Sequence, residues 1–211
     1  MRRKDSGILR FLTPEEKAEL FKVISADKSR YANRNKAIFY LSEYCALRAS
    51  EIGLLTLSDF DVARKSIFCR RLKGSKNNTL KIVNSGVYEA LEHYYWERVQ
   101  FHSSDNHLFL SQLGKPISRK TLDMLMKSYC SCTQIPNDKR HFHVLKHTRA
   151  MELIEYDDVK LTDVQWWLGH RNIQNTMIYL DYTSNAMLTL FNKVELMEGG
   201  DAYDGNREVC S

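Results

Sequence analysis

The segment His143-Val144-Leu145-Lys146-His147-Thr148 decides how the rest of the chain is interpreted. On a helix, side chains three and four positions apart lie on one face, so His143, Lys146 and His147 are expected to project together. Such a face can present a proton carrier and a cation to a single phosphate group. A His-x-x-Lys pattern alone more often lies on a solvated helix surface, so the segment is informative only together with its partners elsewhere in the chain.

Three further segments supply side chains of the same chemical kind. They are Ala46-Leu47-Arg48-Ala49-Ser50-Glu51, Lys73-Gly74, and Leu168-Gly169-His170, and Tyr179 follows His170 by nine residues. A tyrosine can attack phosphorus once it loses its proton, and fixed cations can stabilise the charge that develops on the phosphate oxygens. A lysine on a hairpin can protonate the leaving oxygen. The ordered set indicates phosphodiester strand exchange without a metal or another cofactor.

Composition restricts the class of protein. The 211 residues are 43% hydrophobic with a net charge of +5, and acidic residues gather after position 195, so a basic body with an acidic tail suits a polyanionic partner. No apolar run reaches the ~20 residues that a membrane span needs. Five cysteines without disulfide spacing favour a reducing cytosol.

A zinc site is the one metal site that the cysteines suggest. Cys130-x-Cys132 lies near His141-x-His143, but this spacing is not that of common zinc fingers. A buried thiol on a helix is the preferred interpretation. We therefore expect no metal.

Periodicity and turn chemistry predict a mainly α fold with a small antiparallel β-hairpin. Thr13-Pro14-Glu15-Glu16 has the signals of a helix start. Helices are predicted from there to about Ile24, over Asn33–Ala46, from a Ser50 cap through Leu55, and over Val87–Val99, Ser118–Ser131, His143–Tyr156, Thr162–Leu168 and Asn185–Met197. Strands are predicted over Ser66–Leu72 and Thr79–Val83, joined by a turn over residues 74–78. A basic arm over residues 1–10, one domain over 11–198 and a flexible acidic tail over 199–211 complete the expected organisation.

The motifs together resemble the tyrosine recombinases, the phage integrase family, over about residues 11–190. Ala46-Leu47-Arg48-Ala49-Ser50-Glu51 is similar to the family's first arginine motif, and Lys73-Gly74 to its hairpin lysine. His143-x-x-Lys146-His147-Thr148 is similar to its His-x-x-Arg-His box, and Leu168-Gly169-His170 to its Leu-Gly-His. The resemblance implies the catalytic-domain fold of that family (α+β).

The resemblance also implies a role for each residue. Tyr179 would form a 3′-phosphotyrosine, Lys73 would protonate the 5′-oxygen, and Arg48, Lys146 and His170 would hold the phosphate. His143 would assist as a base or hydrogen-bond partner. Glu51 and His147 would support these side chains from behind. Four protomers would exchange strands on double-stranded DNA, coupled by the C-terminal helix, in the cytoplasm at the nucleoid.

Two departures from the family pattern leave alternatives open. Lysine stands at position 146 where the family has an arginine, which leaves open a DNA-binding regulator that cuts weakly or not at all. Tyr182 lies three residues beyond Tyr179 and could compete as the nucleophile. A relaxing topoisomerase with the same phosphotyrosine chemistry is disfavoured by the Leu-Gly-His segment.

The length of the chain is similar to that of the short fimbrial phase-switch recombinases, which lack an N-terminal DNA-clamping domain; a fragment of a longer integrase is the other possibility. DNA contacts must then come from basic side chains, which give affinity and salt dependence. The predicted contacts are Arg70, Arg71, Lys76, Arg119, Lys120, Arg140 and Arg171. The target site, and the choice between inversion, integration and excision, cannot be taken from these motifs.

Overall fold

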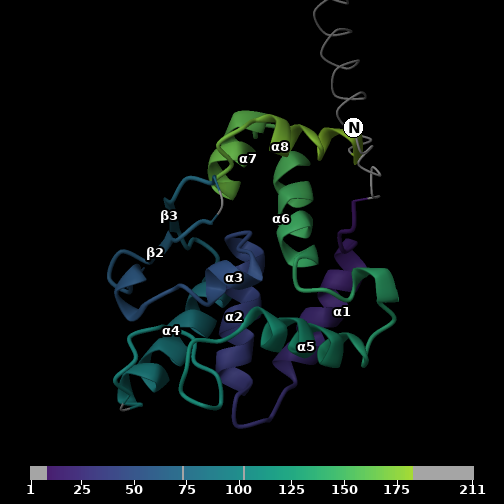
Figure 1. Cartoon of the computed structure of the whole chain (residues 1–211). Coiled ribbons are helices and arrows are strands. Elements are labelled where there is room, and N and C mark those ends of the chain that lie inside the picture. The colour runs from purple at the N-terminus through teal and green to yellow at the C-terminus, as the bar shows by residue number, and fades with distance from the viewer. Residues whose placement is uncertain (1–8, 73, 102, 183–211) are drawn as a thin grey trace, which may run out of the picture.

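The computed structural model describes residues 9–72, 74–101 and 103–182, and within them the chain is mainly helical (Figure 1). The helices are α1 Pro14–Ser25, α2 Ala32–Tyr44, α3 Ala49–Ile52, α4 Ser85–Gln100, α5 Arg119–Cys130, α6 Val144–Ile154, α7 Leu161–Leu168 and α8 Gln174–Met177. The 3-10 turns are η1 Leu57–Asp59, η2 Asn137–Lys139 and η3 Leu180–Tyr182. Strands β1 Phe60–Asp61, β2 Ser66–Cys69 and β3 Asn78–Lys81 form one antiparallel sheet in the order β1-β2-β3. The predicted fold class is confirmed.

The first helix begins where its sequence predicts. The Thr13 hydroxyl accepts a hydrogen bond from the Glu16 N–H at 3.3 Å, and the Glu16 carboxylate accepts one from the Thr13 N–H at 2.8 Å. This reciprocal cap satisfies two backbone donors that a helix start leaves unpaired, and such a cap contributes about 1 kcal/mol. Leu20 and Ile24 are buried on the face that packs against α2 and α5.

Helix α2 lies at the centre of the core and packs against α1, α4 and α6. Ile38, Phe39 and Leu41 have no exposed surface. The Phe39 ring meets Tyr129 of α5 and Phe142 edge-on, with ring centroids 5.3 Å apart in both pairs. Because α2 is held on several sides, the turn that follows it is a rigid support for Arg48.

Strands β2 and β3 form the predicted hairpin in a shorter form. Their register pairs Ser66 with Lys81 and Cys69 with Asn78. The predicted first strand continued to Leu72, but the chain leaves the ladder after Cys69 because the Arg71 side chain turns into the interior. Strand β1 was not predicted, since a two-residue strand has no detectable alternation.

Helix α3 differs from its prediction at both ends. Ser50 was expected to cap a helix running through Leu55, whereas Arg48 is the N-cap and the helix ends at Ile52. The Glu51 carboxylate accepts the Arg48 N–H at 2.9 Å, so a residue of the first turn binds the backbone of the N-cap residue. This cap places the Arg48 side chain at the start of the helix.

Helix α6 stands between α1 and α5 on one side and α7 and α8 on the other, and the hairpin extends from the α3 side up to α7 (Figure 1). α6 begins at Val144, with His143 as its N-cap, and α7 ends at Leu168, with Gly169 as its C-cap. Tyr179 joins a second buried cluster with α6 and α7 residues, including Met151 and Leu168. The short helix α8 and turn η3, neither of which was predicted, carry the chain from His170 to this cluster.

Several predictions fall outside the described residues. They concern most of the basic arm, Lys73, the helix over Asn185–Met197 and the acidic tail. The division into arm, domain and tail therefore stays a prediction. Among the residues that the structure describes, no helix has both the length and the apolar character that crossing a bilayer requires.

Candidate active site

Arg48 and Glu51 form a charged pair at the start of α3. Arg48 Nη1 donates to Glu51 Oε1 at 2.7 Å and reaches Ser75 Oγ in the hairpin turn at 3.4 Å. The Arg48 side chain keeps 32% of its surface exposed, whereas Glu51 has none. Glu51 Oε1 also accepts the N–H of Leu72 at 3.1 Å. The buried carboxylate thus orients an arginine that remains accessible to a ligand.

The first turns of α6 carry the three residues expected to share a face. The rings of His143 and His147 meet edge-on with centroids 4.5 Å apart. Lys146 is 2% exposed, and its ammonium lies 3.5 Å from the carbonyl oxygen of Leu168, the last residue of α7. Lys146 is therefore buried, although a solvated helix surface was the simpler expectation for this pattern.

His170 is placed by a tight turn at the end of α7. Gly169 has φ +67°, a left-handed conformation that glycine adopts without strain. The buried His170 ring lies with Nδ1 3.0 Å from the hydroxyl oxygen of Thr176 in α8, whose side chain is also buried. Nε2 is then the ring nitrogen left for a ligand. Thr176 was not predicted, because nothing in its spacing marks a hydroxyl that supports an imidazole.

Tyr179 lies against α6. It is 1% exposed, and its hydroxyl is 3.0 Å from His147 Nδ1. Tyr182 is 39% exposed and its hydroxyl accepts the N–H of Leu9 at 2.9 Å. The two tyrosines therefore have different surroundings, because the Tyr179 hydroxyl contacts His147 and the Tyr182 hydroxyl contacts Leu9 in the N-terminal segment.

The hairpin turn docks directly on the turn that precedes His170. Lys76 donates its N–H to the Gly169 carbonyl at 2.7 Å, and Ser75 pairs with His170 in an isolated antiparallel bridge. Lys73 lies in this turn by sequence but outside the described residues. Its neighbours Leu72 and Ser75 contact Glu51 and Arg48, so the residues on both sides of Lys73 lie against the Arg48–Glu51 pair.

Arg48, Lys146 and the three histidines form a positively charged cluster. Burial and this positive charge shift the pKa values of its titratable groups. Burial lowers the pKa of His143 to about 4, and the charges of Lys146 and Arg48 act in the same direction. The pKa of His147 and that of His170 are each lowered to about 3, mainly by burial. Burial, followed by Arg48 and Arg71, lowers the pKa of Lys146 to about 7. At neutral pH the three imidazoles are therefore uncharged and able to accept protons.

The pKa values of two acidic groups near these cations shift in opposite directions. Burial raises the pKa of the Tyr179 hydroxyl, against a smaller lowering by the charge of Arg48. Burial alone would raise the pKa of Glu51, but the Arg48 N–H and the charges of Arg71 and Arg48 hold it below its ordinary value. Glu51 is therefore an anion inside the cluster, and Tyr179 is protonated.

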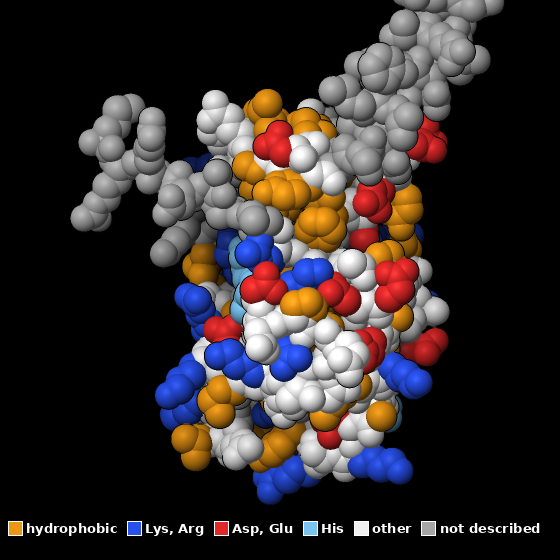
Figure 2. Space-filling view, turned by 90° about the vertical axis from the view of Figure 1, so that its right-hand side faces the viewer, with side chains coloured by type: hydrophobic (Ala, Val, Ile, Leu, Met, Phe, Trp, Pro, Cys, Tyr) orange, Lys and Arg blue, Asp and Glu red, His pale blue; other side chains and the backbone are white. Residues whose placement is uncertain are grey.

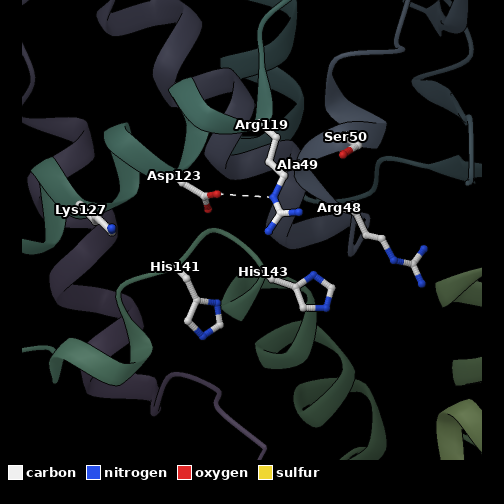
Figure 3. Close-up of a pocket in the computed structure, with 8 residues that line it drawn as sticks. All are labelled: Arg48, Ala49, Ser50, Arg119, Asp123, Lys127, His141 and His143. Carbon is white, nitrogen blue, oxygen red and sulfur yellow. Dashed lines mark ion pairs between the residues drawn. The ribbon is translucent and has the colours of Figure 1, made fainter.

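A cavity of about 470 Å³ opens beside this cluster, between α5 and the start of α6 (Figure 3). Its lining residues are Arg48, Ala49, Ser50, Arg119, Asp123, Lys127, His141 and His143. Arg119 pairs with Asp123 across one turn of α5 at 3.6 Å. Figure 2 shows histidine side chains set among Lys and Arg on this side of the molecule. Lys127 and His141 were not predicted as site residues. Lys127 comes near Arg48 because α5 packs on α3, and His141 lies two residues before His143.

The geometry can be compared with known proteins. A model described as the phage integrase family matches residues 10–185. The chain belongs to the phage integrase family. The resemblance to the tyrosine recombinases is thereby confirmed.

Curated members of the phage integrase family are similar over most of this chain. It is 30% identical over 189 residues to tyrosine recombinase XerC of Caldanaerobacter subterraneus subsp. tengcongensis, with 89% of this chain and 52% of that protein covered. It is 33% identical over 178 residues to the type 1 fimbriae regulatory protein FimB of Escherichia coli K12, with 83% and 85% covered. The chain thus spans about half of XerC and most of FimB.

The solved structures confirm the family fold. The XerH site-specific recombinase bound to a palindromic difH substrate superposes with a TM-score of 0.74 at 20% sequence identity. That match covers 92% of this chain and 56% of XerH. The predicted catalytic-domain fold of the phage integrase family is therefore confirmed.

The predicted DNA contacts fall into different groups. Arg71 is wrong as a DNA contact, because its side chain has no exposed surface and its guanidinium is held by backbone carbonyls. Arg70 is 43% exposed and pairs with Asp59 at 2.8 Å. Arg140 is half-buried and donates to the Ile135 carbonyl at 2.7 Å. The remaining four are exposed and stay predictions: Lys76, Arg119, Lys120 and Arg171.

The cysteines do not approach a metal-binding arrangement where the structure describes them. Cys130 is buried and Cys132 is exposed, so the two thiols face different environments. Across the described ranges, no three His, Cys, Asp or Glu side chains gather as metal ligands.

Proposed function

We propose that the protein cuts and rejoins DNA at specific sites through a 3′-phosphotyrosine formed on Tyr179. The observation that carries the proposal is the convergence of Arg48, Lys146 and His170, which lie within electrostatic range of one another beside the Tyr179–His147 hydrogen bond. Cations and dipoles that are fixed before reaction stabilise charge on phosphate oxygens with little reorganisation. Membership of the phage integrase family supports the same chemistry.

In the proposed step the Tyr179 oxygen forms a bond to phosphorus while the bond to the 5′-oxygen breaks. Neutral His147 holds the phenol, and His143, which meets the His147 ring edge-on, assists as a base or hydrogen-bond partner. Lys73 gives a proton to the departing 5′-oxygen. A second strand then attacks the phosphotyrosine through its own 5′-hydroxyl, so the bond energy is retained and neither a metal nor a nucleotide cofactor takes part.

Attack requires a movement of the segment that carries the nucleophile. Tyr179 is 1% exposed, so a DNA phosphorus cannot approach its hydroxyl in the conformation described here. The segment consists of α8 and η3, which are four and three residues long. Elements this short have few internal hydrogen bonds to lose, so we propose that this segment shifts when DNA binds.

The partner that suits this site is double-stranded DNA. The exposed side chain of Arg119 lines the cavity and exposed Lys120 follows it at the start of α5, while Lys76 and Arg171 lie on the hairpin and after α7. XerH, which shares the fold, is bound to its difH substrate. We propose that four copies assemble on DNA through the segment beyond residue 182, in the cytoplasm at the nucleoid.

Inversion of a short DNA segment is the specific reaction that we propose. The chain spans 85% of FimB, a regulatory protein of type 1 fimbriae, but about half of XerC. The 33% identity to FimB supports the fimbrial switch type, which inverts a promoter segment. Inverted repeats beside a promoter near the gene would agree with inversion, whereas an attachment site beside phage genes would indicate integration.

A DNA-binding regulator without cutting activity is the second candidate, and one observation favours it. Lys146 stands where the family motif has arginine, and its pKa of about 7 leaves it only partly charged at neutral pH. A lysine also lacks the planar fork that holds two phosphate oxygens. The remaining catalytic residue types are all present, so strand transfer ranks first.

The test is covalent trapping on nicked DNA. A pool of nicked duplexes with randomised arms would be incubated with the protein, and any duplex that becomes attached would be recovered and sequenced. We expect an adduct on one sequence class. No adduct on any sequence would favour the regulator, and adducts on all sequences would indicate a topoisomerase.

The nucleophile is tested with the recovered duplex. Tyr179→Phe should abolish the adduct, and the matched variant Tyr182→Phe should retain it, because only Tyr179 contacts His147. Adduct formation by the Tyr179→Phe protein would contradict the assignment.

A further inference from the structure

Arg71 is the most completely engaged cation among the described residues of the site. Its Nη1 donates to the Ala46 carbonyl at 3.1 Å, and its Nη2 donates to the carbonyls of Cys45 at 2.9 Å and Trp167 at 2.8 Å. Its Nε donates to Asn78 Oδ1 at 3.2 Å. All three guanidinium nitrogens are thus occupied, and the side chain has no exposed surface with which to reach DNA.

The carbonyls that Arg71 binds belong to two separate parts of the site. Cys45 and Ala46 form the turn that leads into Arg48, and Ala46 has φ +52°, a left-handed conformation that a non-glycine residue seldom adopts. Trp167 lies three residues before His170, at the end of α7. One guanidinium therefore joins the Arg48 turn to the His170 turn, although more than a hundred residues separate them.

Asn78 reinforces the same connection from β3. Its Nδ2 donates to the carbonyls of Trp166 at 2.8 Å and Trp167 at 3.1 Å, while its Oδ1 accepts from Arg71. Gly169 packs directly against this pair, because a Cβ there would lie 3.0 Å from Arg71 Cγ and 2.6 Å from the Lys76 carbonyl oxygen. The end of α7 is thereby fixed against the hairpin on two sides.

We propose that Arg71 is a positioning residue for strand transfer, which sets the spacing between Arg48 and His170 by binding the backbone of both turns. The inference rests on the proposed function, since spacing matters only if the two side chains hold one phosphate. Rate losses on the order of 100-fold follow from misplacing a catalytic group by about 1 Å. Glu51 Oε2 lies 3.5 Å from Arg71 Nη1, so the carboxylate that orients Arg48 also balances the charge of Arg71.

The planar shape of the guanidinium, rather than its charge alone, is what the arrangement uses. Three carbonyls and an amide oxygen surround it in directions that match a fork of five donors. A lysine keeps the charge but has one compact ammonium on a shorter side chain, so Arg71→Lys loses the separate Nε and Nη1 donors to Asn78 and Ala46 and weakens the connection between the two turns. Arg64→Lys is the control, because Arg64 is not among the predicted DNA contacts and its exposed side chain pairs with Asp61 at the surface.

The experiment compares these variants on the nicked duplex recovered with the wild-type protein. At saturating protein, Arg71→Lys should slow adduct formation on the order of 100-fold, whereas Arg64→Lys stays within about threefold. The Kd of Arg71→Lys for the duplex should stay within about threefold of wild type, since no phosphate contact is removed. A loss in Kd with an unchanged rate, or no loss at all, would overturn the inference.

A second substrate separates positioning from general damage to the fold. A methylphosphonate at the scissile position carries no negative charge on its non-bridging oxygen and needs less help from Arg48 and His170. The defect of Arg71→Lys should therefore shrink at least about tenfold on this substrate. An equal defect on both substrates would show a structural role only.

Folding and the proposed function are controlled separately. If Arg71→Lys does not show a cooperative thermal transition, Asn78→Ser replaces it, because it removes the Nδ2 donor to the Trp166 and Trp167 carbonyls, the second of which Arg71 also binds. Asn78→Ser should show the same methylphosphonate response in a weaker form. Equal adduct rates for Asn78→Ser and wild type would then count against the inference. A wild-type protein that forms no adduct on any duplex would remove the proposed function, and this role for Arg71 with it.

Discussion

Replacing Lys146 with arginine should change the pH dependence of DNA cleavage more than its maximum rate. Lys146 is 2% exposed and lies near Arg48 and Arg71, and these surroundings lower its pKa to about 7. A lysine binds a phosphate oxygen best when it is protonated, so the competent fraction of wild-type protein falls as the pH rises through this value. Arginine stays charged at every pH used for proteins.

The magnitude follows from the two protonated fractions. With a pKa of about 7, Lys146 is about 75% protonated at pH 6.5 and about 3% protonated at pH 8.5. The pH dependence of the second-order rate constant for adduct formation reports the pKa values of groups in the free protein. The rate constant of the wild-type protein divided by that of Lys146→Arg should therefore fall about 25-fold between about pH 6.5 and pH 8.5. Tyr179 and the three histidines do not change protonation over this range, because the pKa of Tyr179 is raised and those of the histidines are lowered, so they leave the ratio unaffected.

The assay is single-turnover adduct formation at subsaturating protein, measured from pH 6.5 to 8.5 at fixed ionic strength. Lys160→Arg is the control, because Lys160 is exposed before α7 and outside the cluster. Its ratio to wild type should be constant. A constant ratio for Lys146→Arg as well would refute the reasoning, since it would mean that Lys146 keeps its charge throughout or does not act on the phosphate.

Three other predictions concern the hydrogen bond to His170, the buried charge of Glu51 and the salt dependence of DNA binding. Thr176→Val removes the hydroxyl 3.0 Å from His170 Nδ1 and should lower the cleavage rate about tenfold at saturating protein with Kd unchanged; an unaltered single-turnover rate would count against it. Glu51→Gln leaves Arg48 and Arg71 without their buried counter-ion and should lower the free energy of unfolding in urea by about 3 kcal/mol, so a loss below about 1 kcal/mol would contradict the pairing. The logarithm of DNA affinity should fall linearly with the logarithm of salt concentration, with a slope of about −0.9 per phosphate contact, and a flat response in filter binding would exclude a broad phosphate footprint.

Local signals in the sequence predicted several elements within a residue or two. Thr13 and Pro14 mark the start of α1, and the alternation around Ile67 and Leu80 marks the hairpin. These patterns depend on neighbours within one turn or one strand pair, so the sequence contains them directly. The α3 cap was misplaced, because the helix begins two residues earlier than the local rule for Ser50 predicts, with Arg48 as N-cap and its N–H bound by the Glu51 carboxylate.

The order of chemically active residues along the chain determined the family and predicted the catalytic set, because those residue types and spacings rarely occur together by chance. Burial and contact were decided only by the tertiary structure. Arg71 and Arg70 are adjacent arginines on one hairpin, yet one is enclosed by carbonyls from two distant turns and the other pairs with Asp59 near the surface. Whether a cation meets solvent or a buried carbonyl depends on which remote segments pack beside it, and adjacent residues in a chain contain no record of that packing.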